Sequence, residues 1–320
     1  MEIFDLNTWQ VILNFKTIFL GIIIEALPFI LISVIVSSVL HNFVSEELIQ
    51  RVLPKDKMAS IVLSCLLGMI FPACDCGMVP IVRRLVKKGV PLYCAVAFML
   101  SAPIINPVVA TATAYAFNSI GMAVARLGIA FLVAYITSAL VSEAFSGTEL
   151  KGVQATHDHG HDHNHDHDDH ACGCGCHHAH TEHKATLSEK FLAVLEGACS
   201  EFFEMGKYLI IGAFLGAVAQ TLVPRATLLN VGHEPFFSII VMMFFAFSIS
   251  VCSTADAFIA ASFNTSFTTG ALVAFMVFGP MIDIKNILML SHAFRLRFVV
   301  FLVTIVSLLC ALGTYVFINL

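Results

Sequence analysis

Long apolar stretches alternate with short polar ones along most of the chain, and this pattern predicts helices that cross a membrane. A transmembrane α-helix needs about 20 predominantly apolar residues. Runs that could supply such a helix are found at about 11–44, 60–82, 90–117, 120–141, 202–222, 236–261, 270–290 and 298–318. We therefore predict an all-α polytopic membrane protein with about eight transmembrane helices.

Four of these runs contain residues that break or loosen a helix. Proline removes a backbone donor and glycine permits unusual dihedral angles, so interruptions are expected at 72–77, 101–107, 250–254 and 279–280. Inside a membrane, a broken helix is tolerated only against protein or a water-filled cavity. The residues assigned as structural breaks are Gly77, Pro80, Pro103, Pro107 and Pro280. The alternative for 71–80 is a loop at the membrane surface.

The chain divides into a first membrane repeat (1–146), a polar loop (147–186) and a second membrane repeat (187–320). A carboxylate, a cysteine break and a proline break recur in the same order in both repeats. The matching pairs are Glu25 with Glu204, Cys74 with Cys252, and Asn106 with Asp283. Interrupted segments at corresponding positions of two repeats mark the binding site of many transporters. Four spans per repeat would give both repeats one orientation, whereas an odd number of crossings would invert them.

Composition supports membrane insertion. Hydrophobic residues make up 58% and charged residues 12%, and the mean hydropathy is +0.88. A soluble globular domain has about 25% charged residues, so the lipid bilayer is the expected surrounding. No basic patch suits nucleic acid, and the N-terminal residues lack the cationic stretch of a cleaved signal peptide. Cations at 83–88 place both termini and the polar loop inside the cell, whereas those at 51–57 and 295–297 favour the opposite.

Two spaced motifs carry a resemblance to a known family. Cys74-x-Cys76-Gly77-x-x-Pro80, followed by Ser101-x-Pro103-x-x-Asn106-Pro107, resembles the ArsP/DUF318 (UPF0718) permeases. Polar positions of the second half also agree, namely Cys252, Asp256, Gly279, Pro280 and Lys285. The resemblance covers about 18–142 and 196–315. It implies a multi-pass permease of the bacterial plasma membrane and not an enzyme. Some relatives export trivalent organoarsenicals, and others occur with zinc-regulated genes.

The interrupted segments contain the candidate substrate ligands. Thiolates are soft ligands that suit zinc, copper(I) and trivalent arsenic. We predict that one site between the repeats is lined by Cys74, Cys76, Asn106, Cys252 and Asp283. Three alternatives stay open: the cysteines pack as small residues at a kink, Asn106 and Asp283 only cap broken helices, or Cys74 and Cys76 exchange electrons as a redox pair.

Other ionisable residues lie within the apolar runs. Glu25 and Glu204 are candidates for proton coupling, because a buried carboxyl group can carry a proton; either could instead bond a neighbouring helix. Lys285 can pair directly with Asp283 only if the helix breaks there, since residues two apart do not share a helix face. Arg126 is expected at the membrane interface, and so is His292.

The polar loop has a composition typical of metal binding. Eleven of the fourteen histidines lie within 157–183, interleaved with carboxylates and cysteines. Imidazole and thiolate suit zinc, copper or nickel rather than calcium or magnesium. The candidate metal ligands are His157, His159, His161, His163, His165, His167, His170, Cys172, Cys174, Cys176, His177, His178 and His180. The segment cannot build a core, and we interpret it as a weak metal buffer or sensor rather than an inert linker.

Together these features predict a permease that moves a transition-metal or metalloid species, a zinc-like metal or a trivalent arsenical, through a site between two repeats. Transport itself needs no cofactor, and zinc or another transition metal would bind only in the loop. The alternatives are a membrane metal sensor or scaffold that does not transport, and a membrane thiol oxidoreductase. No nucleotide-binding loop is present, so a gradient or a partner supplies the energy. A homo-oligomer and an accessory protein both remain open.

Overall fold

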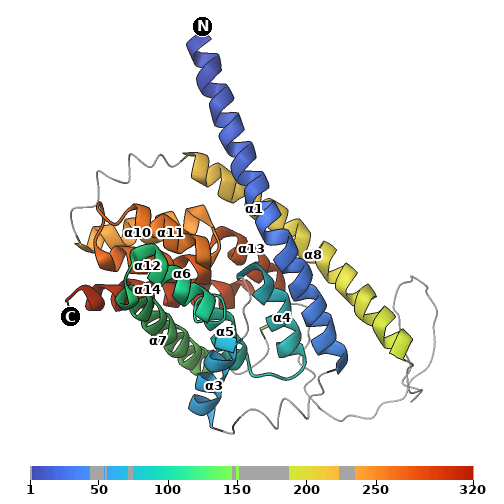
Figure 1. Ribbon diagram of the computed structural model, residues 1–320. Coiled ribbons are helices and arrows are strands. Elements are labelled where there is room, and N and C mark those ends of the chain that lie inside the picture. The colour runs from blue at the N-terminus through green and yellow to red at the C-terminus, as the bar shows by residue number, and fades with distance from the viewer. Residues whose placement is uncertain are drawn as a thin grey trace, which may run out of the picture.

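The computed structural model describes residues 2–43, 54, 56–70, 75–145, 149–150, 187–222 and 235–319. Regular secondary structure in this part of the chain is helical (Figure 1), apart from one isolated bridge between Leu150 and Phe294. The prediction of an all-α protein is therefore confirmed for the described residues.

A long helix, four short helices and a second long helix follow one another twice along the chain. The polar loop 147–186 is called the His/Cys-rich loop from here on. The helices before it are α1 (Glu2–Phe43), α3 (Lys57–Ile70), α4 (Asp75–Lys87), α5 (Leu92–Ser101), α6 (Pro107–Phe117) and α7 (Ile120–Ala144). Those after it are α8 (Leu187–Leu222), α10 (Pro235–Ile249), α11 (Ser253–Ser262), α12 (Thr269–Met281), α13 (Ile284–Ala293) and α14 (Leu296–Asn319). The short helices therefore come in pairs at the predicted interruptions.

By length and composition, five segments of the described chain could cross a membrane. They are Trp9–Val39, Ile120–Ala144, Val194–Thr221, Thr269–Ala293 and Leu296–Phe317. In an 18-residue stretch of Thr269–Ala293, which α12 and α13 form, 83% of the residues are buried within the protein, against 28% in Leu296–Phe317. The remaining apolar helices are shorter, so the expected count of about eight spans is not confirmed.

Side-chain caps explain where two of the interruptions fall. Asn106 Oδ1 accepts a hydrogen bond from the backbone N–H of Val109 at 2.9 Å, and Pro107 is the first residue of α6. Asp283 Oδ1 accepts from the N–H of Asn286 at 2.6 Å and thereby starts α13. These bonds satisfy N–H groups that a helix start leaves without partners. Capping by Asn106 and Asp283 is therefore a structural fact.

Three of the residues predicted to break helices lie inside them. Gly77 and Pro80 belong to α4, and Pro280 is within α12. A proline removes one backbone bond without obliging the helix to stop, and the chain leaves helical geometry only at 282–283, where Asp283 can cap the next helix. The assignment of Gly77, Pro80 and Pro280 as chain breaks is therefore wrong, whereas Pro103 and Pro107 do flank a break.

The two longest helices, α1 and α8, run in opposite directions (Figure 1). Ser38 of α1 donates a hydrogen bond to the carbonyl of Val194 near the start of α8. Toward the other end, the ring of Phe19 lies edge-on to that of Phe214. The expectation that corresponding helices of the two halves share one orientation is therefore wrong for this pair. The inverted arrangement is the one it adopts.

Helices α3 and α4 do not continue in one direction. Helix α3 lies parallel to α5, since Cys65 contacts Ala97 and Gly68 lies against Ser101. Helix α4 joins α5 through the short turn 88–91 and packs against it, so α4 runs back relative to α3. In contrast, α5 and α6 both pack against α7 and together form one interrupted rod.

The second half repeats this arrangement. The start of α10 lies near the end of α14, where Phe236 contacts Tyr315, as the start of α3 lies near the end of α7, where Lys57 pairs with Glu143. Helix α11 returns through the turn 263–268 and packs against α12. Glu149, near the start of the His/Cys-rich loop, contacts the α13–α14 turn, because the backbone N–H of Arg295 donates a hydrogen bond to the Glu149 carbonyl at 2.9 Å.

Candidate functional site

The starts of α4, α11 and α13 meet near the middle of the helix bundle. Asp75 is the first residue of α4, Asp283 caps α13, and 250–252 leads into α11. A helix start carries partial positive charge, which stabilises nearby carboxylates. The fold thus brings acidic side chains together from segments about two hundred positions apart in the sequence.

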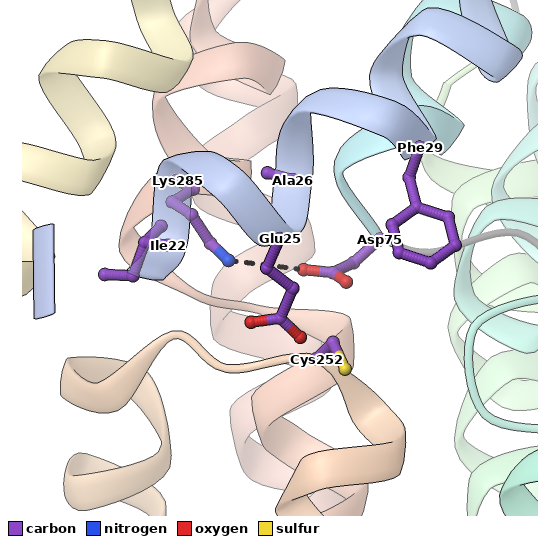
Figure 2. A pocket seen from close by; sticks show the side chains of 7 residues that line it. All are labelled: Ile22, Glu25, Ala26, Phe29, Asp75, Cys252 and Lys285. Carbon is purple, nitrogen blue, oxygen red and sulfur yellow. Dashed lines mark ion pairs between the residues drawn. The ribbon is translucent and has the colours of Figure 1, made fainter. Parts of the chain in front are cut away.

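A small, partly open pocket with a cavity volume of about 10 Å³ lies at this meeting point (Figure 2). Its lining comes from both halves of the chain: Ile22, Glu25, Ala26, Phe29 and Asp75 from the first, and Cys252 and Lys285 from the second. Figure 2 shows Glu25 extending from α1 toward Cys252, while Lys285 points toward Asp75. The polar side chains of the pocket therefore face one another.

Lys285 links three segments at the back of the pocket. Its Nζ donates a hydrogen bond to the carbonyl of Ser250 at 2.6 Å, and it lies 3.5 Å from Asp283 Oδ2 and 4.0 Å from Asp75 Oδ2. Ser250 Oγ donates to Asp283 Oδ2 at 2.6 Å. The pair between Lys285 and Asp283 forms across the interruption, as the sequence required. Sequence reasoning did not pair Lys285 with Asp75.

A second buried charge lies between α6, α7 and α11. Arg126 Nη1 donates to Thr113 Oγ1 and Nη2 to the carbonyl of Ser253, both at 2.8 Å. The Arg126 side chain is 0% exposed and interacts electrostatically with buried Asp256. Arg126 is thus enclosed by protein, which the sequence analysis did not predict, and its position at the membrane interface stays a prediction. The available signal was its position, well inside the apolar run of α7.

The predicted substrate ligands have separate locations. Cys252 lines the pocket and lies within hydrogen-bonding reach of Glu25. Asp283 is buried behind the pocket, and buried Asn106 caps α6 away from the lining residues. Cys74 lies outside the described residues, as does the side chain of Cys76, although Asp75 between them is in the lining.

Glu204 lies apart from the pocket residue Glu25, with which the sequence paired it. Its carboxylate is 2.9 Å from Arg83 Nη1 on α4 and 2.6 Å from His292 Nε2 on α13. Nearby, Glu201 pairs with Arg84 at 2.6 Å. Glu204 thus bonds neighbouring helices, which was the alternative to proton coupling. A proton-coupling role for either glutamate stays a prediction.

The described part of the chain contains no group of three or more His, Cys, Asp or Glu side chains arranged to hold a metal ion. The thirteen candidate ligands of the polar loop, His157 to His180, lie outside the described residues. Metal binding by that loop stays a prediction from its composition.

Comparison with known proteins gives the family. Residues 11–318 match the ArsP_1 family, described as a predicted permease. The UPF0718 protein YcgR of Bacillus subtilis (strain 168) is 45% identical over 304 residues, covering 94% of this chain and 96% of that protein. A "putative two-component membrane permease complex subunit" of Streptococcus mutans serotype c is 40% identical over 289 residues, covering 90% and 89%.

No solved structure matches the chain. The family and the apolar helices together indicate a multi-pass protein of the plasma membrane. With a match that spans nearly its whole length, the chain belongs to the ArsP_1 family of predicted permeases.

Proposed function

We propose that this protein is a permease that moves a transition-metal or metalloid species, a zinc-like metal or a trivalent arsenical, through the pocket between its two halves. The observation that carries the proposal is the origin of the lining. Glu25 and Asp75 come from the first half, and Cys252 and Lys285 from the second. A relative movement of the halves would expose such a site to either side of the membrane.

The chemistry of the lining favours a cation with affinity for sulfur. Asp75 in the lining and Asp283 behind it lie within ion-pair distance of Lys285, and Glu25 adds a further carboxylate to the lining. Buried charges are costly unless they are paired, so an excess of carboxylate favours cation binding. Cys252 adds a soft donor, and the sequence places Cys74 and Cys76 on either side of Asp75.

We also infer that the chain crosses the membrane six times. The crossings would be α1, α5 with α6, α7, α8, α12 with α13, and α14. The pairs α3–α4 and α10–α11 would be hairpins that enter the membrane and return to the same side. The reversal of α4 relative to α3 and the antiparallel arrangement of α1 and α8 support this topology. Three crossings per half would make the two halves inverted repeats.

With this topology, the groups of cationic residues no longer favour opposite orientations of the chain in the membrane. The connections before α3, after α4 and before α14 would all lie on the side of the His/Cys-rich loop. These connections and the helix ends next to them carry Arg51, Lys55, Lys57, Arg83, Arg84, Lys87, Lys88, Arg295 and Arg297. Because Lys and Arg are enriched in cytoplasmic connections, we propose that the loop is cytoplasmic and that both termini are outside.

The proposal also includes metal binding by the His/Cys-rich loop and an accessory subunit. We propose that the loop binds zinc or another transition metal through the histidines and cysteines of 157–180, as a buffer separate from the transport pocket. The Streptococcus relative is named as a subunit of a two-component complex. We infer that this permease too can work with an accessory subunit.

Substituting Cys74, Cys76 and Cys252 together by serine is expected to lower zinc or arsenite flux at least about tenfold, because a hydroxyl is a poor ligand for soft species. Flux is measured in liposomes containing the purified protein. Cys199→Ser is the matched control, since Cys199 is exposed on α8 away from the pocket. Unchanged flux in the triple variant would remove the thiols from the mechanism.

Deleting 157–183 should leave flux intact while lowering the amount of zinc bound in calorimetry.

A further inference from the structure

We propose that Lys285 is a tethered cation that competes with the cargo for the pocket carboxylates, and that its displacement releases the segment carrying Cys252. This inference names the residue that regulates the pocket and rests on the proposed function for the identity of the cargo. Three features of the described residues support it: the fixed position of the ammonium group, the charges that surround it, and the strained segment that it holds.

The position of Lys285 is set by packing. The residue is 4% exposed, and its main chain lies directly against Gly212 of α8. Any side chain at position 212 would come within 3.0–3.3 Å of the Cα, Cβ and Cγ atoms of Lys285. The stem is therefore confined between α8 and α13, and its Nζ is directed to the carboxylates of Asp75 and Asp283.

Acidic side chains from several of the segments around the pocket lie near this ammonium group. Asp283 precedes it on α13, Asp75 begins α4, and Glu25 projects from α1. Cys252 lies across the pocket, and Asp256 of α11 interacts with Lys285 electrostatically. A cationic cargo bound in the pocket by Asp75 would lie next to Nζ, where like charges repel. The ammonium group and the cargo are therefore competitors for one position.

Lys285 also holds a strained segment in place. Ser250 has a φ angle of 55°, in the left-handed region that non-glycine residues seldom adopt. The Lys285 Nζ bond to the Ser250 carbonyl, the Ser250 Oγ bond to Asp283 and a bond from Gln220 to the Ile249 carbonyl hold this conformation. Displacing the ammonium group removes one of these bonds two residues before Cys252. Cargo binding would thereby shift the 250–252 segment toward another conformation.

Transport kinetics test the competition. In liposomes containing the full chain, Lys285→Met is expected to lower the zinc KM about tenfold and also the maximal rate, since cargo that binds more tightly leaves more slowly. Lys285→Arg retains the charge and should stay close to the original KM. Lys207→Met, at an exposed position on α8, is the control and should change neither value. A KM that is unchanged or raised in Lys285→Met would overturn the proposal.

Alkylation of Cys252 tests, without a transport measurement, whether Lys285 holds the 250–252 segment in place. In metal-free buffer, N-ethylmaleimide should modify Cys252 several-fold faster in Lys285→Met than in the unaltered protein or in Lys207→Met, as measured by mass spectrometry of the Cys252 peptide. An equal rate in all three proteins would show that Lys285 does not hold the segment. If the unaltered protein moves neither zinc nor arsenite, the proposed function fails. The alkylation rates still decide whether Lys285 holds the 250–252 segment in place.

Discussion

Replacing Arg126 by methionine is expected to destabilise the folded protein by about 3–5 kcal/mol, because removing one partner from a buried polar network leaves the others unpaired. Arg126 supplies hydrogen bonds to Thr113 Oγ1 and to the carbonyl of Ser253, and it interacts electrostatically with buried Asp256. The start of α11 would lose its link to α6 and α7. In a thermal melt in detergent, the midpoint should fall by roughly 10 °C.

Two variants separate the charge of Arg126 from its geometry. Arg126→Lys keeps a cation but cannot donate in two fixed directions, so an intermediate loss is expected. Adding Asp256→Asn to Arg126→Met removes the uncompensated carboxylate, and the midpoint should recover in part. A melting midpoint that does not change in Arg126→Met would contradict a structural role for this cluster.

Gly77→Ala is expected to force α1 and α4 apart, at a cost of about 1–3 kcal/mol for overpacking and with loss of transport. A Cβ atom at position 77 would overlap Ser33 Oγ and lie 2.7 Å from Ser33 Cβ. Asp75 lies two residues away, so the same displacement would carry it out of the pocket lining. Thermal melts together with zinc flux in liposomes measure the two effects.

A second substitution should relieve the overlap that Gly77→Ala creates. Ser33→Gly removes both atoms that the new Cβ would meet, so the Gly77→Ala and Ser33→Gly double variant should recover stability and flux. Gly21→Ala is the matched control on α1, since nothing lies within 4 Å of a Cβ there. Alanine is the better helix former by roughly 1 kcal/mol, so this control should be neutral or stabilising. If Gly21→Ala and Gly77→Ala behaved alike, close packing of α1 on α4 would not be the reason for Gly77.

Local features of the fold were predictable from the sequence. The interruptions near Asn106 and after Ser250 fall where the pattern places them, since caps and helix breakers act over a few residues. Asp283 likewise caps α13. The role of Gly77 was not predictable, because a glycine that relieves dihedral strain and one that permits close packing look identical in a sequence.

The pocket depends on long-range contacts that local patterns do not encode. Cys252 was predicted to lie at the site, but Asp75 and Lys285, which line the pocket with it, come from different halves of the chain. Apolar runs alone do not show whether two short helices cross the membrane or fold back on each other, so they did not predict the antiparallel arrangement of α1 and α8. The enclosure of Arg126 was not predicted for a related reason: Ser253 of α11 comes from the other half of the chain, and no local pattern brings it beside α7.

The position of the His/Cys-rich loop relative to the two termini tests the inverted architecture most directly. Epitope tags are placed at the N-terminus, at the C-terminus and within 157–183 in three otherwise identical proteins, and antibody access is compared in intact and permeabilised cells. With six crossings, both terminal tags should be accessible in intact cells and the loop tag only after permeabilisation. Eight crossings in one orientation would put all three tags on the same side, and that result would contradict the meeting of two inverted halves at the pocket.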